Sequence, residues 1–111
     1  MGWRRTYHCE SCRLEATVSG GKDQGFYVET ETRYCPHCQK LDDVELSLWC
    51  KDMLPGLLPP SRVEELLEAE KEFGLCPSCR HPGGVPWSSG SPCPKCGGNM
   101  QAVEGQLEQW I

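Results

Sequence analysis

Four Cys-x-x-Cys pairs constrain this chain more than any other feature, because they hold eight of the nine cysteines in only 111 residues. Two intervening residues let both thiolates of a pair reach one tetrahedral ion from a tight turn, and two pairs complete a four-sulfur shell. We therefore expect two metal sites. The expected ligands are Cys9, Cys12, Cys35, Cys38, Cys76, Cys79, Cys93 and Cys96.

The size of the chain gives the metal sites a structural role. A chain of 12.4 kDa that divides into two halves leaves each half too little interior to fold on apolar burial alone. Structural zinc contributes about 10–16 kcal/mol of apparent binding free energy in small peptides. We expect the metal-free chain to be largely unfolded.

The start of the chain and its charge bear on compartment and partners. MGWRRTYHC has no apolar run after its charged residues, and no stretch approaches transmembrane length, which favours a cytoplasmic protein with reduced thiols over a disulfide scaffold. No membrane partner is expected. The formal net charge is −5, and each zinc with four thiolates adds −2, giving about −9. Such an acidic protein is a poor match for a phosphate backbone, which disfavours nucleic acid as a partner.

Residues 1–50 are predicted to form a first, three-stranded zinc ribbon. Apolar residues alternate over 14–18 and again over 26–34, and Gly20 to Gly25 supply a turn between them, so these segments predict a hairpin. A third strand is expected over 44–50, with Cys50 on its apolar face as a small buried hydrophobe.

Residues 51–74 are predicted to be a linker with one helix at about 61–73, with Ser61 as its N-cap and Gly74 at its end. Residues 75–111 then form the second ribbon, in which Val85 to Trp87 pair with 100–103, and the terminal Trp110 and Ile111 pack back on the chain. The expected fold class is a small metal-stabilised α+β protein with two zinc ribbons, short antiparallel β-hairpins with CxxC knuckles, joined by a helix-containing segment.

The four pairs can combine at two ions in more than one way. Sequential pairing, with Cys9, Cys12, Cys35 and Cys38 at one ion, closes the shortest loops and matches the hairpin interpretation, so it is the expected one. The alternative is a crossed arrangement that joins the first pair to the third.

The chain resembles zinc-ribbon proteins, with Cys93-Pro94-Lys95-Cys96-Gly97-Gly98 as its most typical knuckle. The hairpin tip Ser19-Gly20-Gly21-x-Asp23-x-Gly25-Phe26 is similar to that of small, mostly uncharacterised bacterial double-ribbon proteins. This resemblance implies a fold and little about function. Rubredoxins use the same four-thiolate geometry for iron, but their knuckles precede glycine, whereas Arg13, Gln39 and Arg80 follow three pairs here. Two Zn(II) ions are expected, and iron remains the alternative.

The other polar residues do not assemble a catalytic site in the sequence, so no enzymatic activity is expected. His8, His37 and His81 lie next to ligand cysteines or inside a pair, and we expect them to neighbour the ligands or face solvent. Residues 3–7 contain the one basic and aromatic cluster, which is interpreted as an N-terminal arm packed on the first ribbon.

The expected function is a non-enzymatic zinc-binding module that presents a surface to a protein partner of unknown identity. Trp49, Trp87 and Trp110 are more aromatic surface than two small ribbons can readily bury, and exposed tryptophans are enriched at binding hot spots. The alternatives are a nucleic-acid-associated ribbon protein and a rubredoxin-like iron electron carrier.

Overall fold

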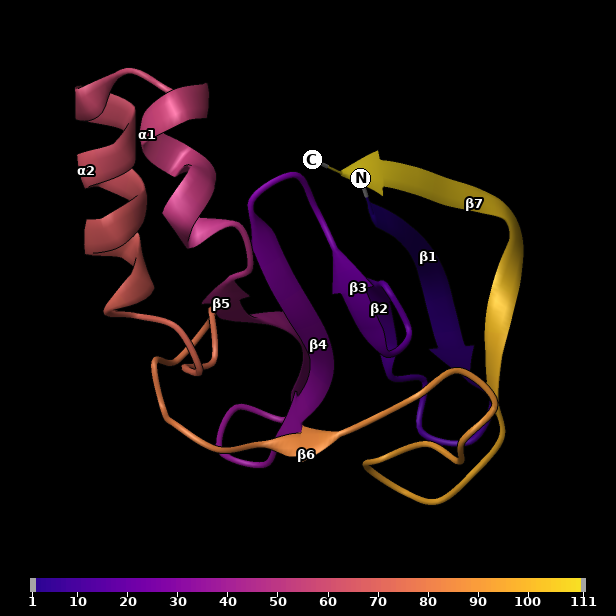
Figure 1. Cartoon of the computed structure of the whole chain (residues 1–111). Helices are drawn as coiled ribbons and strands as arrows, with labels where there is room; N and C mark the ends of the chain where they lie inside the picture. The colour runs from indigo at the N-terminus through magenta and orange to yellow at the C-terminus, as the bar shows by residue number, and fades with distance from the viewer. Residues whose placement is uncertain (1, 111) are drawn as a thin grey trace.

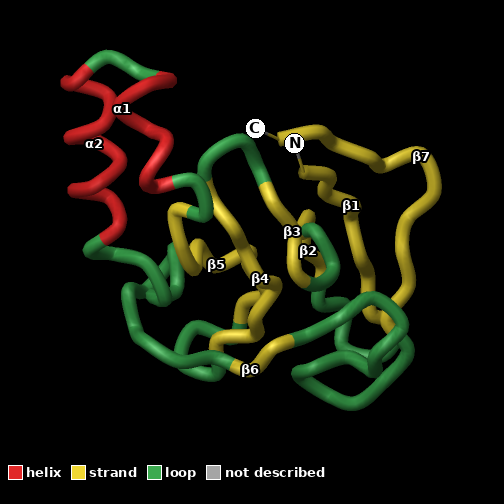
Figure 2. Tube along the Cα trace, viewed as in Figure 1, coloured by secondary structure: helices red, strands yellow, loops and turns green. Residues whose placement is uncertain are grey.

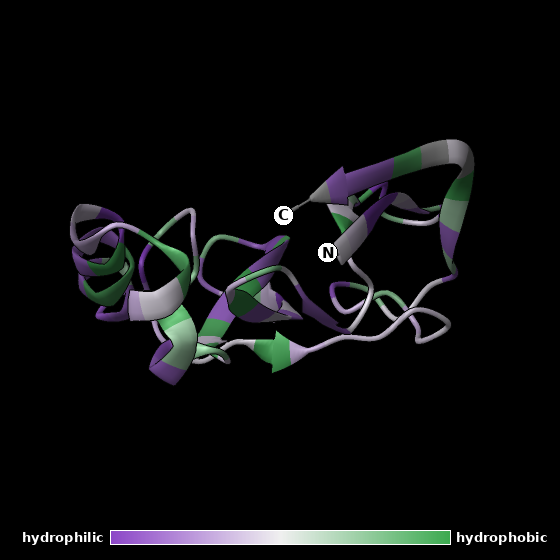
Figure 3. Ribbon diagram, turned by 45° about the horizontal axis from the view of Figure 1, so that its top comes forward, coloured by the Kyte–Doolittle hydropathy of each residue, from purple (hydrophilic) through white to green (hydrophobic). Residues whose placement is uncertain are grey.

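A computed structural model describes residues 2–110 as two antiparallel β-sheets with a helical hairpin at one end (Figure 1). The molecule is elongated, with extents of 48 × 30 × 16 Å. The helices lie at one end of it and β7 at the other (Figure 3). The elements in chain order are β1 (Gly2–Cys9), β2 (Glu15–Val18), β3 (Lys22–Gln24), β4 (Val28–Cys35), β5 (Lys40–Leu48), the 3₁₀ helix η1 (Lys51–Met53), α1 (Leu54–Leu57), α2 (Pro60–Glu70), β6 (Val85–Pro86) and β7 (Met100–Trp110).

The strand order shows how the two ends of the chain meet. One sheet has the order β2-β1-β7, and the other has the order β3-β4-β5 with β6 paired to β4. Because β7 is antiparallel to β1, Gly2 lies opposite Trp110 and Cys9 lies opposite Met100. The two termini are therefore neighbours in space (Figure 1). The side chain of Trp110 and all of Ile111 lie outside the described residues, and their predicted packing stays a prediction.

The predicted first hairpin is wrong in its pairing. β2 pairs with β1 and not with β4, and β4 takes β3 and β5 as its neighbours. The chain crosses between the sheets at Gly20 and Gly21, whose φ angles of 82° and 146° suit glycine alone. The backbone N–H groups of both glycines donate to Thr32 Oγ1, at 3.0 and 3.1 Å, so this crossing is fixed to β4.

One hydrophobic core lies between the two sheets and draws on both ends of the chain. Tyr7 and Val18 from one sheet, Tyr34 and Leu41 from the other, and Trp87 from the segment after β6 form one buried cluster. Trp87 packs its ring edge to face against Tyr7, with centroids 5.0 Å apart at 76°, and donates from Nε1 to the carbonyl of Pro92 at 2.9 Å. The chain before the linker and the chain after it thus contribute to the same interior.

A second, smaller core joins the helices to the end of β5. Leu48, Cys50 and Leu54 are buried there, which confirms Cys50 as a small hydrophobe. α2 begins at Pro60, one residue before the predicted start, and its N-cap is Pro59, so Ser61 lies inside the first turn and makes no cap. None of the helices described in residues 2–110 is long and apolar enough to cross a membrane.

The segment after the helices runs from one sheet to the other. β6 pairs with β4, with Tyr34 opposite Val85, and not with residues 100–103 as predicted. The backbone of Trp87 donates to the carbonyl of Thr32, and that of Ser89 donates to the carbonyl of Gly20. One long loop joins the end of α2 to β6, and another runs on from β6 to the region below β1 (Figure 2). This path brings the last two cysteine pairs to two different places in the fold.

Candidate metal centres

All four Cys-x-x-Cys pairs adopt the same local turn. In each, the residue after the second cysteine donates its backbone N–H to the carbonyl of the first cysteine, at 2.8–3.0 Å. That residue lies in the left-handed region in all four turns, with φ of 57–76°. The residues concerned are Arg13, Gln39, Arg80 and Gly97. Three of them are not glycine, so these turns keep a conformation that costs an L-residue about 1–2 kcal/mol.

The eight predicted ligands gather into two quartets. Their sulfur atoms lie within 4.8 Å of one another in each quartet. The shortest cross-knuckle Sγ–Sγ distances are 3.5 and 3.6 Å in both quartets. A tetrahedral ion with metal–sulfur bonds of about 2.3 Å has an edge of about 3.8 Å, whereas a disulfide needs about 2.05 Å. The first quartet is Cys9, Cys12, Cys93 and Cys96, and the second is Cys35, Cys38, Cys76 and Cys79.

The predicted sequential pairing is therefore wrong, and so is the crossed alternative. The first knuckle meets the fourth and the second meets the third, so one quartet is nested inside the other along the chain. Loop entropy favours the sequential arrangement only weakly: the loop from Cys12 to Cys93 is less than two doublings longer than that from Cys12 to Cys35, a difference of about 1 kcal/mol. The long pairing of β1 with β7 outweighs this, because it places the fourth knuckle directly beside the first.

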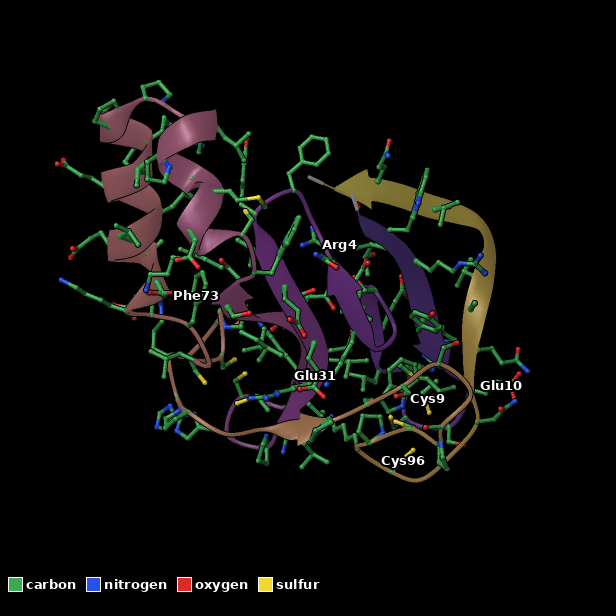
Figure 4. All side chains as sticks on the ribbon, viewed as in Figure 1. Arg4, Cys9, Glu10, Glu31, Phe73 and Cys96 are labelled. Carbon is green, nitrogen blue, oxygen red and sulfur yellow. The ribbon has the colours of Figure 1, made fainter. Side chains whose placement is uncertain are left out.

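Close contacts between the first and fourth knuckles hold the first quartet together. Glu10 donates its backbone N–H to the carbonyl of Asn99 at 3.2 Å. Gly98 lies against the first knuckle so closely that a Cβ placed on it would be 2.6 Å from Ser11 Oγ and 2.9 Å from Ser11 Cβ. Figure 4 shows Cys9 and Cys96 close together below the end of β1. Ser11, near the other end of the chain, therefore leaves room only for glycine at position 98.

The second quartet is built at the end of the β4-β5 hairpin. Cys35 ends β4 and lies opposite Lys40 of β5. The third knuckle is fixed beside it by the hydroxyl of Ser78, which donates to the Asp42 carboxylate at 3.2 Å. The Cys76 backbone N–H donates to the carbonyl of His81 at 2.9 Å, which closes the turn that follows.

Proton affinities within the quartets are unequal. The backbone N–H of Cys12 holds the pKa of the Cys9 thiol at about 6, and that of Cys38 holds the pKa of Cys35 at about 7. Burial raises the pKa of Cys38 to about 12, and burial also raises the pKa of Cys93. Each quartet therefore has one thiol that ionises more easily than a free cysteine and another whose ionisation is opposed by burial.

The donor set fits a borderline or soft divalent ion. Four convergent thiols at tetrahedral spacing suit zinc and ferrous iron alike, and they leave no ligand position for water or substrate. Three of the four cysteines in the first quartet are at most half-exposed, and Cys96 is the exposed one. The arrangement is suited to holding the ends of the chain together.

One buried acid that sequence reasoning did not single out ties the two sheets together. The side chain of Asp43 on β5 is only 4% exposed. Its carboxylate accepts from the Ser19 backbone and hydroxyl, from Thr32 Oγ1 at 2.6 Å, and from Arg4 Nε at 3.1 Å. No short-range pattern marks this residue, because Arg4, Ser19 and Thr32, which contact its carboxylate, lie far from it in the sequence.

The three histidines lie in two different environments. His8 lies on β1 with Nδ1 3.6 Å from Glu15. His37 and His81 both lie beside the second quartet, exposed and stacked on each other with ring centroids 3.6 Å apart. One ligand atom from each of these two rings and the Cys79 sulfur lie within 4.8 Å of one another. That grouping was not predicted, because it depends on the second and third knuckles meeting.

The aromatic residues divide between core and surface. Trp49 is 44% exposed, as expected, and Trp3 is 50% exposed. Trp87, one of the three tryptophans expected to be hard to bury, is only 4% exposed and lies in the core between the sheets. Tyr7 is buried beside it, so residues 3–7 are part of a central strand and not an arm.

Comparison of the chain with known protein families, with curated proteins and with solved structures finds no match. The two cysteine quartets fit a zinc-ribbon-like arrangement on geometry alone.

Proposed function

We propose that this protein is a non-enzymatic, cytoplasmic double zinc-ribbon protein that presents a rigid surface to a protein partner. The observation that carries the proposal is the pair of nested quartets, each of which joins a knuckle from the first 50 residues to one from the last 40 or so. Ligation at both sites would hold the segment with the last two knuckles against the ends of β1 and β4. The ions would supply folding free energy of about 10–16 kcal/mol each and no reaction chemistry.

A candidate contact surface lies where the β3-β4 turn meets the start of the helical segment. Phe26 is 47% exposed, Trp49 44% and Met53 54%, and we call these three the aromatic edge. Trp49 is held in place because its Nε1 donates to the carbonyl of Gly25 at 3.0 Å. The Cys50 thiol donates to the carbonyl of Phe26, which ties the turn to the chain leading to Met53. An ordered exposed indole is typical of a binding hot spot, because little side-chain entropy remains to be lost.

Charge weighs against nucleic acid as the partner. Arg4, part of the one basic and aromatic cluster, contacts the Asp43 carboxylate, and Arg33 contacts Glu31 at 3.0 Å. With a formal charge of −5 before metal binding, few cations are left to neutralise phosphates together.

The test is affinity capture from the source organism with the metal-loaded protein as bait. We compare the wild type with a Phe26→Ser/Trp49→Ser variant and with Trp3→Ser, a matched control because Trp3 is similarly exposed, at 50%, on the other sheet. A protein retained in stoichiometric amount by the wild type and the control, and lost with the aromatic-edge variant, supports the proposal. A protein that the aromatic-edge variant retains as well as the wild type does would contradict the proposal.

Metal analysis of the same samples settles the ion. Two zinc ions per chain are expected, and iron at two per chain would replace the proposal with an electron carrier. Submicromolar oligonucleotide binding at about 150 mM salt, lost in an Arg4→Ala/Arg5→Ala variant, would make nucleic acid the partner.

A further inference from the structure

Two histidines from distant parts of the chain meet beside the second quartet. His37 lies inside the second knuckle and His81 follows the third, and their rings stack at 3.6 Å with 22° between the planes. Both side chains are exposed. The meeting does not serve the hydrophobic core, because neither ring belongs to either buried cluster.

A third donor completes the group. The half-buried Cys79 sulfur and one nitrogen of each ring lie within 4.8 Å of one another. Cys79 also belongs to the second quartet, and a thiolate sulfur that binds one ion keeps lone pairs with which it can bridge to another. A quartet that holds a divalent ion carries a net charge of −2, which attracts a further cation to its outer side.

The stacked rings need only a small adjustment to share an ion. Lone pairs of stacked imidazoles run parallel in the ring planes, so the rings must turn toward a common point. Rotation about the last side-chain bond of histidine is broad and soft, and exposure leaves both rings room to turn. The polar contact that holds His81 is weak, with Nδ1 3.3 Å from the carbonyl oxygen of Cys79.

We propose that His37, His81 and the Cys79 thiolate form a third site, for a borderline divalent ion such as zinc. Two imidazoles and one thiolate are a donor set that such ions prefer. The site is open to solvent and has three protein donors, so its ion exchanges more readily than those in the closed quartets. The inference goes beyond the proposed function, since it requires no partner protein.

The test is a titration of zinc chloride into protein that already holds its two quartet ions. The wild type is expected to bind a third equivalent. A His37→Ala/His81→Ala variant is expected to bind it at least about tenfold more weakly, since even residues that only orient metal ligands contribute that much. The matched control is His8→Ala: His8 also adjoins a quartet cysteine, but it contacts Glu15 and is absent from the group of donors around Cys79.

A second measurement uses the wild-type protein and so does not depend on how a variant folds. Imidazole resonances of His37 and His81 are expected to shift on addition of the third equivalent, while those of His8 stay in place. Absence of a third equivalent up to about 0.1 mM free zinc, equal binding by the double variant, or a shift of His8 alone would each overturn the proposal.

Discussion

A methyl group added at Gly98 should loosen the ion in the first quartet. Gly98→Ala would place Cβ at 2.6 Å from Ser11 Oγ, 2.9 Å from Ser11 Cβ and 3.2 Å from Cys96 Sγ. Carbon atoms pack best at about 3.5–4.0 Å, so the fourth knuckle must move away from the first. Gly98 is not among the glycines with positive φ, so the cost arises from this contact and not from the backbone conformation.

The expected cost is that of overpacking, about 1–3 kcal/mol. This corresponds to about 5- to 150-fold weaker binding of the ion. Ser11→Gly removes both of the closest atoms and leaves only the 3.2 Å contact with sulfur. Ser11→Gly should therefore restore most of the affinity that Gly98→Ala loses, although Ser11→Gly alone costs about 0.5–1 kcal/mol in backbone entropy.

The assay is competition for zinc between the protein and a chromophoric chelator, applied to both single variants and the double variant. Gly97→Ala is the matched control: its φ is 76° and no described atom lies within 4 Å of the added Cβ. It should cost about 1–2 kcal/mol through conformation, and Ser11→Gly should not relieve that cost.

Additive effects of Ser11→Gly and Gly98→Ala would refute this reasoning. Residues that share no contact add within about 0.3–0.5 kcal/mol, and under sequential pairing positions 11 and 98 would belong to different metal sites. A coupling above about 1 kcal/mol is possible only if the first and fourth knuckles touch.

Four further predictions concern the buried acid Asp43, its neighbour Asp42, the knuckle conformation and the metal. Asp43→Asn should lower the free energy of unfolding by urea by about 3 kcal/mol, because its amide leaves buried donors unpaired; an effect below about 0.5 kcal/mol would contradict the link between the sheets. Burial raises the pKa of the neighbouring Asp42 in the folded protein above its ordinary value of 3.8. The stabilising contribution of this carboxyl is therefore present below pH 3.8 and is lost as the pH rises through its folded pKa. Asp42→Asn should leave the free energy of unfolding at pH 7 unchanged or higher. Gln39→Gly should raise the free energy of thermal unfolding by about 1 kcal/mol, because Gln39 has a φ of 57°, which is strained for an L-residue. A lower free energy of unfolding would contradict the claim that this turn is strained. Removal of metal by a strong chelator should abolish the dispersion of amide NMR signals, whereas a dispersed metal-free spectrum would show that burial alone suffices.

The sequence predicts the four Cys-x-x-Cys turns well because each turn is local. Each knuckle needs only a few residues, and short-range patterns also predicted the strand segments before and after residues 20–25 and a helix at 61–73. The helix found is Pro60–Glu70, so its predicted end near Gly74 is wrong. The buried state of Cys50 followed from its place beside alternating apolar residues. These features depend on spacing that a short window of sequence contains.

The partners of the knuckles could not be predicted in the same way. They depend on the pairing of β1 with β7, and β7 is hard to recognise because Gly105 interrupts it at a φ of 77°. The register shifts there, so that Arg5 lies opposite Leu107 while Tyr7 lies opposite Ala102. Loop length was the available guide, and a free-energy difference of about 1 kcal/mol is too small to decide against a long strand pair.

The nested pairing of the knuckles can be tested most directly by replacing zinc with cadmium-113 and correlating each cadmium signal with cysteine Hβ protons by NMR. The account predicts one cadmium coupled to Cys9, Cys12, Cys93 and Cys96 and a second coupled to Cys35, Cys38, Cys76 and Cys79. A cadmium coupled to Cys9 and Cys12 together with Cys35 and Cys38 would contradict it.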